Sequence, residues 1–281
     1  MTALTIVDRI ADLFRFHFMQ NALLAGTIVA VVAGVVGWFM VLRGQSFAGH
    51  TLSQVGFPGA AGAALIGAAP EAGLLVFCVA AALAVAALSD GRSLERRSES
   101  AAIGTVLVVA LALGFLFASL YSGFVGAVYA YLFGTFLGIT DAQVVLLLLV
   151  ALGALAAMAL MARPLLFASI DPEAARARGV PVRALAVLFL VVLGIGVAEA
   201  AQITGTLLVF ALLVAPAAAA QQLSATPRTS LILSVLIAVA VTWAGLGVAY
   251  YSPYPIGFFV TTIAFAVYVA VRAGRAVAAR R

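Results

Sequence analysis

Apolar runs of about twenty residues recur along nearly the whole chain, and each is long enough to cross a hydrocarbon layer of about 30 Å as a helix. Of the 281 residues, 65% are hydrophobic and 9% are charged, whereas a soluble domain carries roughly a quarter charged residues. Runs such as VVLLLLVALGALAAMALMA do not alternate as the strands of a membrane β-barrel do. The sequence therefore predicts an all-α, polytopic helical membrane protein.

Nine apolar segments are candidate spans, so we expect about eight to nine transmembrane helices. A further apolar stretch, 122–139, is interrupted by glycines and indicates either a re-entrant piece or a short extra span. Before the first segment, Asp8 and Asp12 stand where a signal peptide carries basic residues, which favours a surface amphipathic helix over 1–17. The nine segments cover about residues 18–42, 55–69, 72–89, 101–120, 143–163, 184–201, 205–222, 230–250 and 256–272.

The formal net charge is +5, and all 15 basic residues are arginine. Because arginines flank apolar segments in alternate connections, membrane orientation explains the charge, and we expect no nucleic-acid partner. Cytoplasmic connections carry an excess of arginine, which places the C-terminus inside and the N-terminal surface helix outside. The arginine-bearing connections hold Arg43; Arg92, Arg96 and Arg97; Arg163, Arg176, Arg178 and Arg183; Arg228; and Arg272, Arg275, Arg280 and Arg281.

Signals for catalysis and cofactors are missing from the sequence. It contains no Gly-x-x-x-x-Gly-Lys phosphate loop, so we expect no ATP site on this chain. The single cysteine, Cys78, lies inside an apolar run and offers neither a disulfide nor a metal cluster. We therefore expect no enzymatic activity and no cofactor.

The stretch SIDPEAARARGVPV, 169–182, builds a short charged element between two apolar segments. Asp171 is a good N-cap, and Pro172 fits the first helical position, where a missing N–H costs nothing. Gly179 suits the left-handed conformation that ends a helix. These signals predict a two-turn helix over 172–178.

A helix this short is unstable alone in water and must dock on another surface. That surface is either the ends of the chain's own spans or a groove on a separate soluble partner. For the second interpretation, Ala174, Ala175 and Ala177 are small enough to enter a groove, and charged side chains can contact its rim. The candidate docking residues are Asp171, Glu173, Ala174, Ala175, Arg176, Arg178 and Gly179.

A polar face precedes the small-residue run GFPGAAGAA. Ser46, His50, Ser53 and Gln54 follow helical spacing, so they share one face of a helix. Histidine within a span is a candidate metal ligand, and the alternative is a hydrogen-bonded packing residue. Glu199, at the outer end of its span, either marks the outer turn or attracts cations.

Several stretches resemble, in order along the chain, the permease subunits of metal-ion ABC transporters, the zinc/manganese/iron family called ABC-3. They are FMQNALLAG, FMVLRGQSFAGHTLSQVGFPGAA, SESAAIGTVLVVALALGFLFAS, YLFGTFLGI, DPEAARARGVPV, GTLLVFALLVAPAAAAQQL and PYPIGFFVTTIAFAVYV. The resemblance implies a fold like that of the cobalamin-importer permeases, with one transmembrane permease domain over 1–281 and a cytoplasmic coupling helix over 171–180.

The resemblance also implies a role and partners. The chain would be a multi-pass plasma (inner) membrane protein that works as a homodimer among membrane lipids. A separate cytoplasmic ATPase dimer would bind the coupling helix, and an extracellular binding protein would deliver zinc, manganese or iron.

The resemblance implies a substrate path lined by Ser46, His50, Ser53, Gln54 and Glu199, with His50 as a metal ligand. At the positions of His50 and Gln54 the family usually carries Asp and His, a pair able to coordinate a passing cation. A histidine with a neutral glutamine lacks the carboxylate that balances a divalent charge.

Two other classes fit the residues less well. An ion-coupled secondary transporter of a small solute often shows internal repeats and charged relay residues inside its spans, and no clear repeat is present. An intramembrane enzyme needs a nucleophile and base, or a metal set, at depth. The chain has only two histidines, and His17 precedes the first span.

Overall fold

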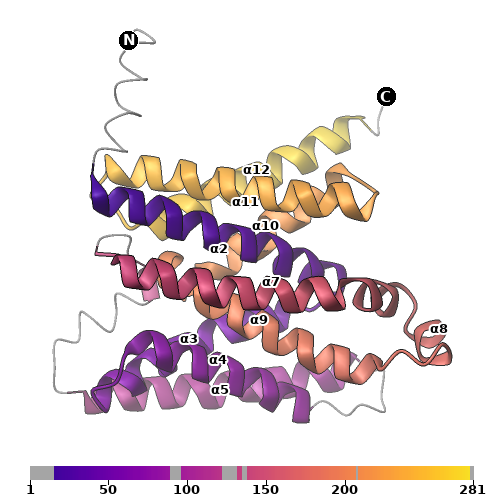
Figure 1. Ribbon diagram of the computed structural model, residues 1–281, viewed down its shortest axis with the longest axis horizontal. Helices are drawn as coiled ribbons and strands as arrows, with labels where there is room; N and C mark the ends of the chain where they lie inside the picture. Colours follow the sequence, from indigo (N-terminus) through magenta and orange to yellow (C-terminus); the bar gives the residue numbers. More distant parts are fainter. Residues whose placement is uncertain (1–15, 89–95, 122–131, 135–137, 207, 279–281) are drawn as a thin grey trace, which may run out of the picture.

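The computed structural model describes residues 16–88, 96–121, 132–134, 138–206 and 208–278, and within them every regular element is helical. The expected all-α fold is confirmed. Figure 1 shows the helices lying side by side in one bundle. They are α2 (His17–Leu42), α3 (Ser46–Leu65), α4 (Pro70–Leu88), α5 (Arg96–Leu120), α7 (Asp141–Ile170), α8 (Pro172–Ala177), α9 (Val182–Thr204), α10 (Val209–Leu223), α11 (Pro227–Tyr250) and α12 (Ile256–Ala278).

Seven helices of the described chain are long and apolar enough to cross a membrane, so the expected count of eight to nine is too high. The two that fall short are α3, which begins with the polar face, and α10. With 15 residues, α10 is about 22 Å long, less than the hydrocarbon thickness. The stretch 122–139 and the surface helix over 1–17 fall largely outside the described residues.

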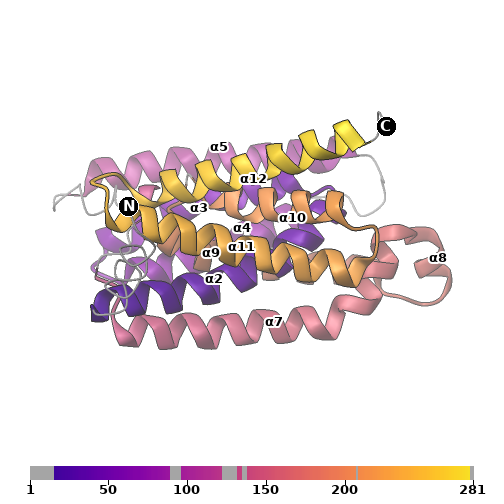
Figure 2. The ribbon, with the colours of Figure 1, turned by 90° about the horizontal axis from the view of Figure 1, so that it is seen from above.

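One end of the bundle gathers the arginines of the described connections. Figure 2 shows α8 and the C-terminal end of α12 at this end, and the first residues of α2 and α7 at the other. The Arg43 guanidinium, after α2, donates to Ser169 Oγ in α7 at 3.2 Å. The Arg275 guanidinium, in α12, donates to the Gln222 carbonyl at the end of α10. These contacts tie together the arginine-rich ends of four helices.

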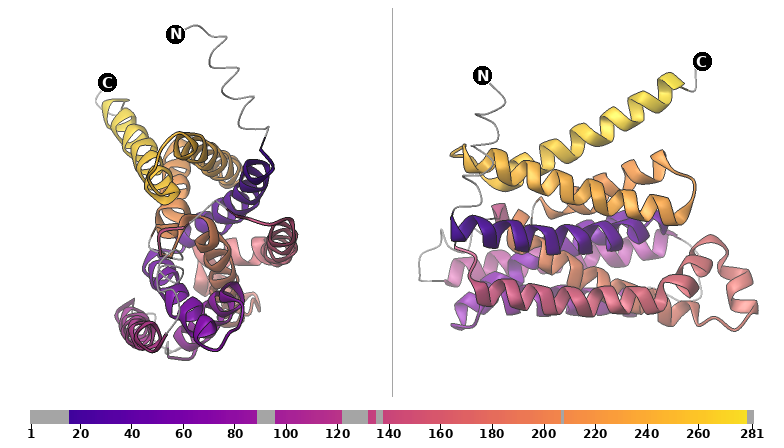
Figure 3. Two further views of the ribbon diagram at one scale, coloured as in Figure 1. Left: turned by 90° about the vertical axis from the view of Figure 1, so that its left-hand side faces the viewer. Right: turned by 45° about the horizontal axis from the view of Figure 1, so that its top comes forward.

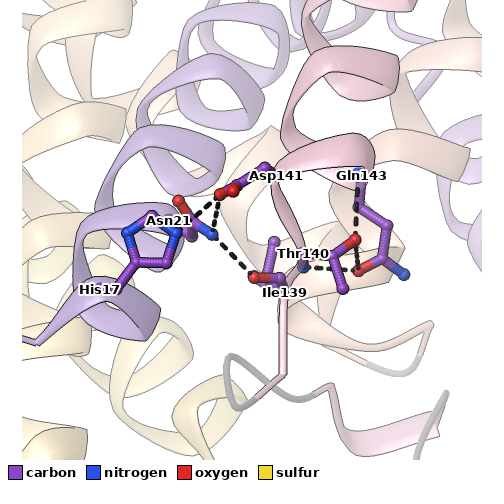
Figure 4. A network of polar contacts seen from close by, with 6 residues as sticks. All are labelled: His17, Asn21, Ile139, Thr140, Asp141 and Gln143. Carbon is purple, nitrogen blue, oxygen red and sulfur yellow. Dashed lines mark hydrogen bonds and ion pairs between the residues drawn. The ribbon is translucent and has the colours of Figure 1, made fainter.

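The opposite end is tied by a polar network at the start of α2 and α7 (Figure 4). The Asp141 carboxylate accepts from Asn21 Nδ2 at 2.7 Å and lies 2.9 Å from His17 Nε2. The same Asn21 amide donates to the Ile139 carbonyl at 3.1 Å. Because Asn21 is almost fully buried, this network anchors the chain entering α7 against the first turns of α2.

A capping box starts α7. The Thr140 hydroxyl accepts from the Gln143 N–H, and the Gln143 side chain accepts from the Thr140 N–H at 3.0 Å, which satisfies two free amides. The Gln143 amide also donates to a Glu71 carboxylate oxygen at 3.1 Å. This bond joins the starts of α7 and α4.

Helices α2 and α9 form the centre of the bundle, and Figure 3 shows α9 enclosed by its neighbours in the end-on view. At several glycines, their backbones lie almost in contact with the backbones of neighbouring helices. A Cβ on Gly37 of α2 would lie 2.1 Å from the Leu213 carbonyl oxygen of α10. A Cβ on Gly194 of α9 would lie 2.9 Å from the Cys78 carbonyl oxygen of α4. Small residues of this kind let helices meet closely in lipid, where no hydrophobic effect drives them together.

The break between α9 and α10 is packed by three glycines. Gly205 has φ of 81° and Gly134 has φ of 76°, so both adopt a left-handed conformation that favours glycine. A Cβ on Gly134 would lie 2.2 Å from the Ile203 carbonyl oxygen, and one on Gly257 would lie 2.6 Å from that of Thr204. The segment 132–134 therefore covers the end of α9, beside the start of α12.

Candidate functional site

The polar face of α3 follows directly on the turn after α2. Gly44 takes φ of 67° there, and the Gln45 N–H donates to the Met40 carbonyl, so the chain reverses and α3 begins at Ser46. Ser46, His50 and Gln54 are half-buried on the shared face. Ser53 is fully buried, and its hydroxyl donates to the His50 carbonyl at 2.6 Å. Ser53 thus uses its hydroxyl within its own helix.

His50 lies where α3 meets α10. Its ring packs edge-on against Phe210, in the first turn of α10, with ring centroids 5.2 Å apart. Its ring nitrogens make no hydrogen bond to any residue that the structure describes, and neither does the Gln54 amide. The hydrogen-bonded packing interpretation of His50 therefore has no partner to support it within this part of the chain. Pro216 lies inside the same helix α10.

Two threonines beside this face were not identified from the sequence. The Thr51 and Thr206 hydroxyls are both fully buried and have no hydrogen-bond partner. The Thr206 methyl lies 2.8 Å from the position of a Cβ on Gly56, which places the α9–α10 connection against α3. The only sequence signal was that Thr51 adjoins His50. The lack of a hydrogen-bond partner for the two threonine hydroxyls depends on tertiary packing, which the local sequence does not show.

Glu199 lies in the next-to-last turn of α9, and it is buried between helices instead of exposed at the end of its span. Its side chain is 1% exposed, and neither carboxyl oxygen has a partner. It follows Gly196, whose Cβ position is 3.2 Å from Val32 of α2, by three residues, a rotation of about 60° back around α9. Helix α2 therefore lies close to α9 near the level of Glu199, whereas His50 packs against Phe210 of α10, and no contact among the described residues joins Glu199 to His50.

The donor set at the polar face is neutral. Across the described residues, no three His, Cys, Asp or Glu side chains lie close enough together to hold a metal ion. The face offers one imidazole, one carboxamide and hydroxyl groups. Such a set can contact a borderline metal ion through nitrogen, but it supplies no charge to hold that ion.

The predicted short helix is present as α8. The Asp171 carboxylate accepts from the Ala174 N–H at 2.9 Å, Pro172 occupies the first turn, and Gly179 takes φ of 79°. The Val180 N–H then donates to the Ala175 carbonyl at 3.0 Å, which closes the end of the helix. The start and stop signals in the sequence therefore act as expected.

Of the three alanines of α8 that were expected to enter a partner's groove, only Ala177 is exposed. Ala175 is fully buried because α8 packs against α7 and α9 of its own chain, and Ala174 is half-buried. The Arg178 guanidinium lies over the Phe167 ring, 5.5 Å from its centroid. The exposed residues of this element are Asp171, Glu173, Arg176, Ala177, Arg178 and Gly179.

Comparisons with known proteins give a consistent result. The family model described as "ABC 3 transport family" matches residues 15–274. The manganese transport system membrane protein MntC of Halalkalibacterium halodurans is 32% identical over 84% of this chain and 80% of its own length. The chelated iron transport system membrane protein YfeC of Yersinia pestis is 32% identical over 86% of this chain and 80% of its own.

A solved structure agrees with these matches. The structure titled "PsaBC from Streptococcus pneumoniae in complex with Fab" superposes with a TM-score of 0.83, at 29% identity, and covers 95% of both chains. The family model covers most of the chain, and the helices match those of a solved relative. The chain therefore belongs to the ABC 3 transport family, as a multi-pass permease of the plasma membrane.

Proposed function

We propose that this permease imports divalent metal ions, delivered by an extracellular binding protein and driven by a separate cytoplasmic ATPase dimer. Two similar proteins are named for manganese and chelated-iron transport, which supports iron, manganese or zinc as cargo. The observation that carries the proposal is His50, a half-buried imidazole inside the bundle with no described hydrogen-bond partner. An imidazole so placed is free to contact a passing ion.

The path itself lies on the polar face of α3. Ser46, His50, Ser53 and Gln54 lie on this face, and a second copy of the chain supplies the matching face across the dimer. Because these groups are neutral, they hold an ion weakly, as conduction requires. Glu199 is a further candidate for the path, because it is a buried acid whose oxygens have no hydrogen-bond partner among the described residues.

Coupling to the ATPase takes place at α8. It projects at the arginine-rich end of the bundle (Figure 2). Six residues between Asp171 and Gly179 are exposed to solvent. Asp171, Glu173, Arg176 and Arg178 supply charge, and Gly179 holds the turn. Ala174 and Ala175 hold α8 against the chain's own helices, so they act in coupling by positioning α8.

The experiment that tests this function is metal uptake by cells that depend on this permease. His50→Ala is expected to lower the initial rate of Mn²⁺ or Fe²⁺ uptake about tenfold, because it removes a metal contact. His17→Ala is the matched control, since His17 is the other histidine and lies exposed at the opposite end of α2. Membrane level of each variant is measured by immunoblot.

Equal uptake by the wild type and His50→Ala, at equal membrane levels, would show that His50 is a packing residue. The double variant His50→Asp/Gln54→His introduces a carboxylate and is expected to strengthen the dependence of uptake on divalent ions. If cells lacking the permease accumulate all three metals normally, the metal-import proposal itself fails.

A further inference from the structure

An open groove lies at the arginine-rich end of the bundle, where the chain leaves α8 and enters α9. It is lined by Arg176, Pro181, Val182, Arg183 and Ala184. Three of these residues are apolar, and both others carry a guanidinium. The groove therefore combines an aliphatic floor with two positive charges, which suits a ligand that is partly anionic and partly apolar.

Neither guanidinium is neutralised within the described part of the chain. No carboxylate there lies within ion-pair distance of Arg176 or Arg183, and both residues are exposed. Glu173 lies one turn before Arg176 on α8 without pairing with it, and the Asp171 carboxylate caps α8 by accepting from the Ala174 N–H. The groove thus presents two positive charges without an internal counterion.

An apolar strip on α9 continues from the groove. Ala184, Leu188, Val191 and Ile195 follow helical spacing; the first two are exposed and the others half-buried. Ile195 lies between Gly194, which faces α4, and Gly196, which faces α2, so the strip points about midway between those two neighbours. The strip lies on the least covered side of an otherwise buried helix.

The length of this strip matches one membrane leaflet. The eleven residue steps from Ala184 to Ile195 rise about 16 Å along the helix, close to half of a hydrocarbon layer of about 30 Å. We propose that the groove binds the phosphate headgroup of an anionic phospholipid, with an acyl chain lying along the strip. Arg183 contacts the phosphate, and Ala184 marks the point where the acyl chain begins.

The continuity of groove and strip favours a lipid over an acidic segment of the ATPase. A soluble protein that docks on the groove would not contact an apolar strip that runs through one leaflet of the membrane. A soluble phosphate shares the headgroup chemistry but also leaves the strip empty. The choice among these three ligands therefore depends on whether the acyl chain contributes to binding.

The experiment titrates the purified full-length permease in detergent with fluorescent phosphatidylglycerol, with phosphatidylcholine of the same chains, and with inorganic phosphate as a competitor. Phosphatidylglycerol is expected to bind more tightly than phosphatidylcholine. Arg183→Gln is expected to weaken phosphatidylglycerol binding about fivefold, the effect of one arginine near an anionic headgroup. Arg163→Gln, which removes an exposed arginine of α7 outside the groove, leaves the affinity unchanged.

A second variant tests the contribution of the apolar strip to lipid binding. Leu188→Gln is expected to weaken both lipids and to leave competition by inorganic phosphate unaltered. Phosphatidylglycerol affinity that survives Arg183→Gln, or that falls equally with Arg163→Gln, overturns the proposal. So does displacement by inorganic phosphate at concentrations equal to the lipid's. Loss of ATPase co-purification in Arg183→Gln with normal lipid binding would assign the groove to the ATPase.

Discussion

Glu199 is a buried acid in the next-to-last turn of α9, one of the two most buried spans of the described chain. Its two oxygens lack hydrogen-bond partners among the residues that the structure describes. A buried polar group without a hydrogen bond costs about 1–3 kcal/mol of stability. A buried acid that lowers stability by this amount either serves a function or is simply a defect of packing. The stability of a variant without the carboxyl group distinguishes these two cases.

Glu199→Met should raise the thermal stability of the purified permease. Removing two unpartnered oxygens recovers about 1–3 kcal/mol, and methionine fits irregular apolar spaces. Unfolding is followed by the temperature at which detergent-solubilised protein loses its monodisperse peak. Glu71→Met is the control, because Glu71 lies at the outer end and bonds to Gln143. A lower unfolding temperature for Glu199→Met would mean that the carboxyl group has partners in the native membrane.

Single residues differ in how well sequence reasoning finds them. The face of Ser46, His50 and Gln54 was predictable because polar residues at helical spacing stand out in an apolar chain. The burial of Glu199 was not, because an acid near the end of an apolar run looks the same whether the helix continues for one turn or two. Thr51 gave no signal beyond its place next to His50, because the lack of a hydrogen-bond partner for its buried hydroxyl depends on distant parts of the chain.

At the scale of elements, α8 is the piece whose local sequence most fully determines its structure. Its N-cap, its first-turn proline and its left-handed glycine each act within a few residues, so no distant contact is needed to predict them. What local sequence could not predict is the face that α8 buries. Ala175 packs inward because α7 and α9 lie beneath it.

Gly179→Val is expected to reduce co-purification of the ATPase with the permease. Valine at φ of 79° costs about 1–2 kcal/mol and distorts the end of α8. Gly179→Asn is the matched control, because asparagine tolerates the left-handed conformation, and it should retain the ATPase. Full ATPase recovery with the valine variant would argue against α8 as the coupling element.

The helices α3 and α10 show where a reading based on apolarity fails. The run over 55–69 was predicted as a span, yet α3 begins at Ser46. Apolarity reports contact with lipid, whereas α3 is packed among α4, α5 and α9 and forms a helix through its polar residues as well. The short α10 is possible for the same reason, since its first residues meet protein and not lipid.

At the scale of the whole molecule, the alternation of arginine-rich and arginine-poor connections predicted which ends of the long described helices lie together (Figure 2). The structure places the arginines of the described connections at one end, with α8 and the last turns of α12 (Figure 1). The order of the helices around α9 was not predictable, because it depends on glycine contacts between segments far apart in sequence.

Orientation gives a prediction at this scale. A reporter active only in the cytoplasm, fused after Arg281, should be active, because arginine-rich connections remain inside. The same reporter inserted at Ser252, between α11 and α12, should be silent. Reporters of the opposite specificity serve as the control. Activity of the cytoplasmic reporter at Ser252 but not after Arg281 would invert the assigned topology.

The glycine contacts between helices have a consequence for how this protein tolerates change. In a soluble core the most sensitive positions hold the largest side chains, because truncation leaves a cavity. Here Gly37, Gly59 and Gly73 stand where one added carbon would fall within 2.1–2.5 Å of a neighbouring carbonyl oxygen. The pattern of sensitivity to substitution is therefore the reverse of that in a soluble core. The smallest residues, these glycines, tolerate the fewest substitutions, whereas large apolar residues that face the lipid can be replaced by other apolar residues.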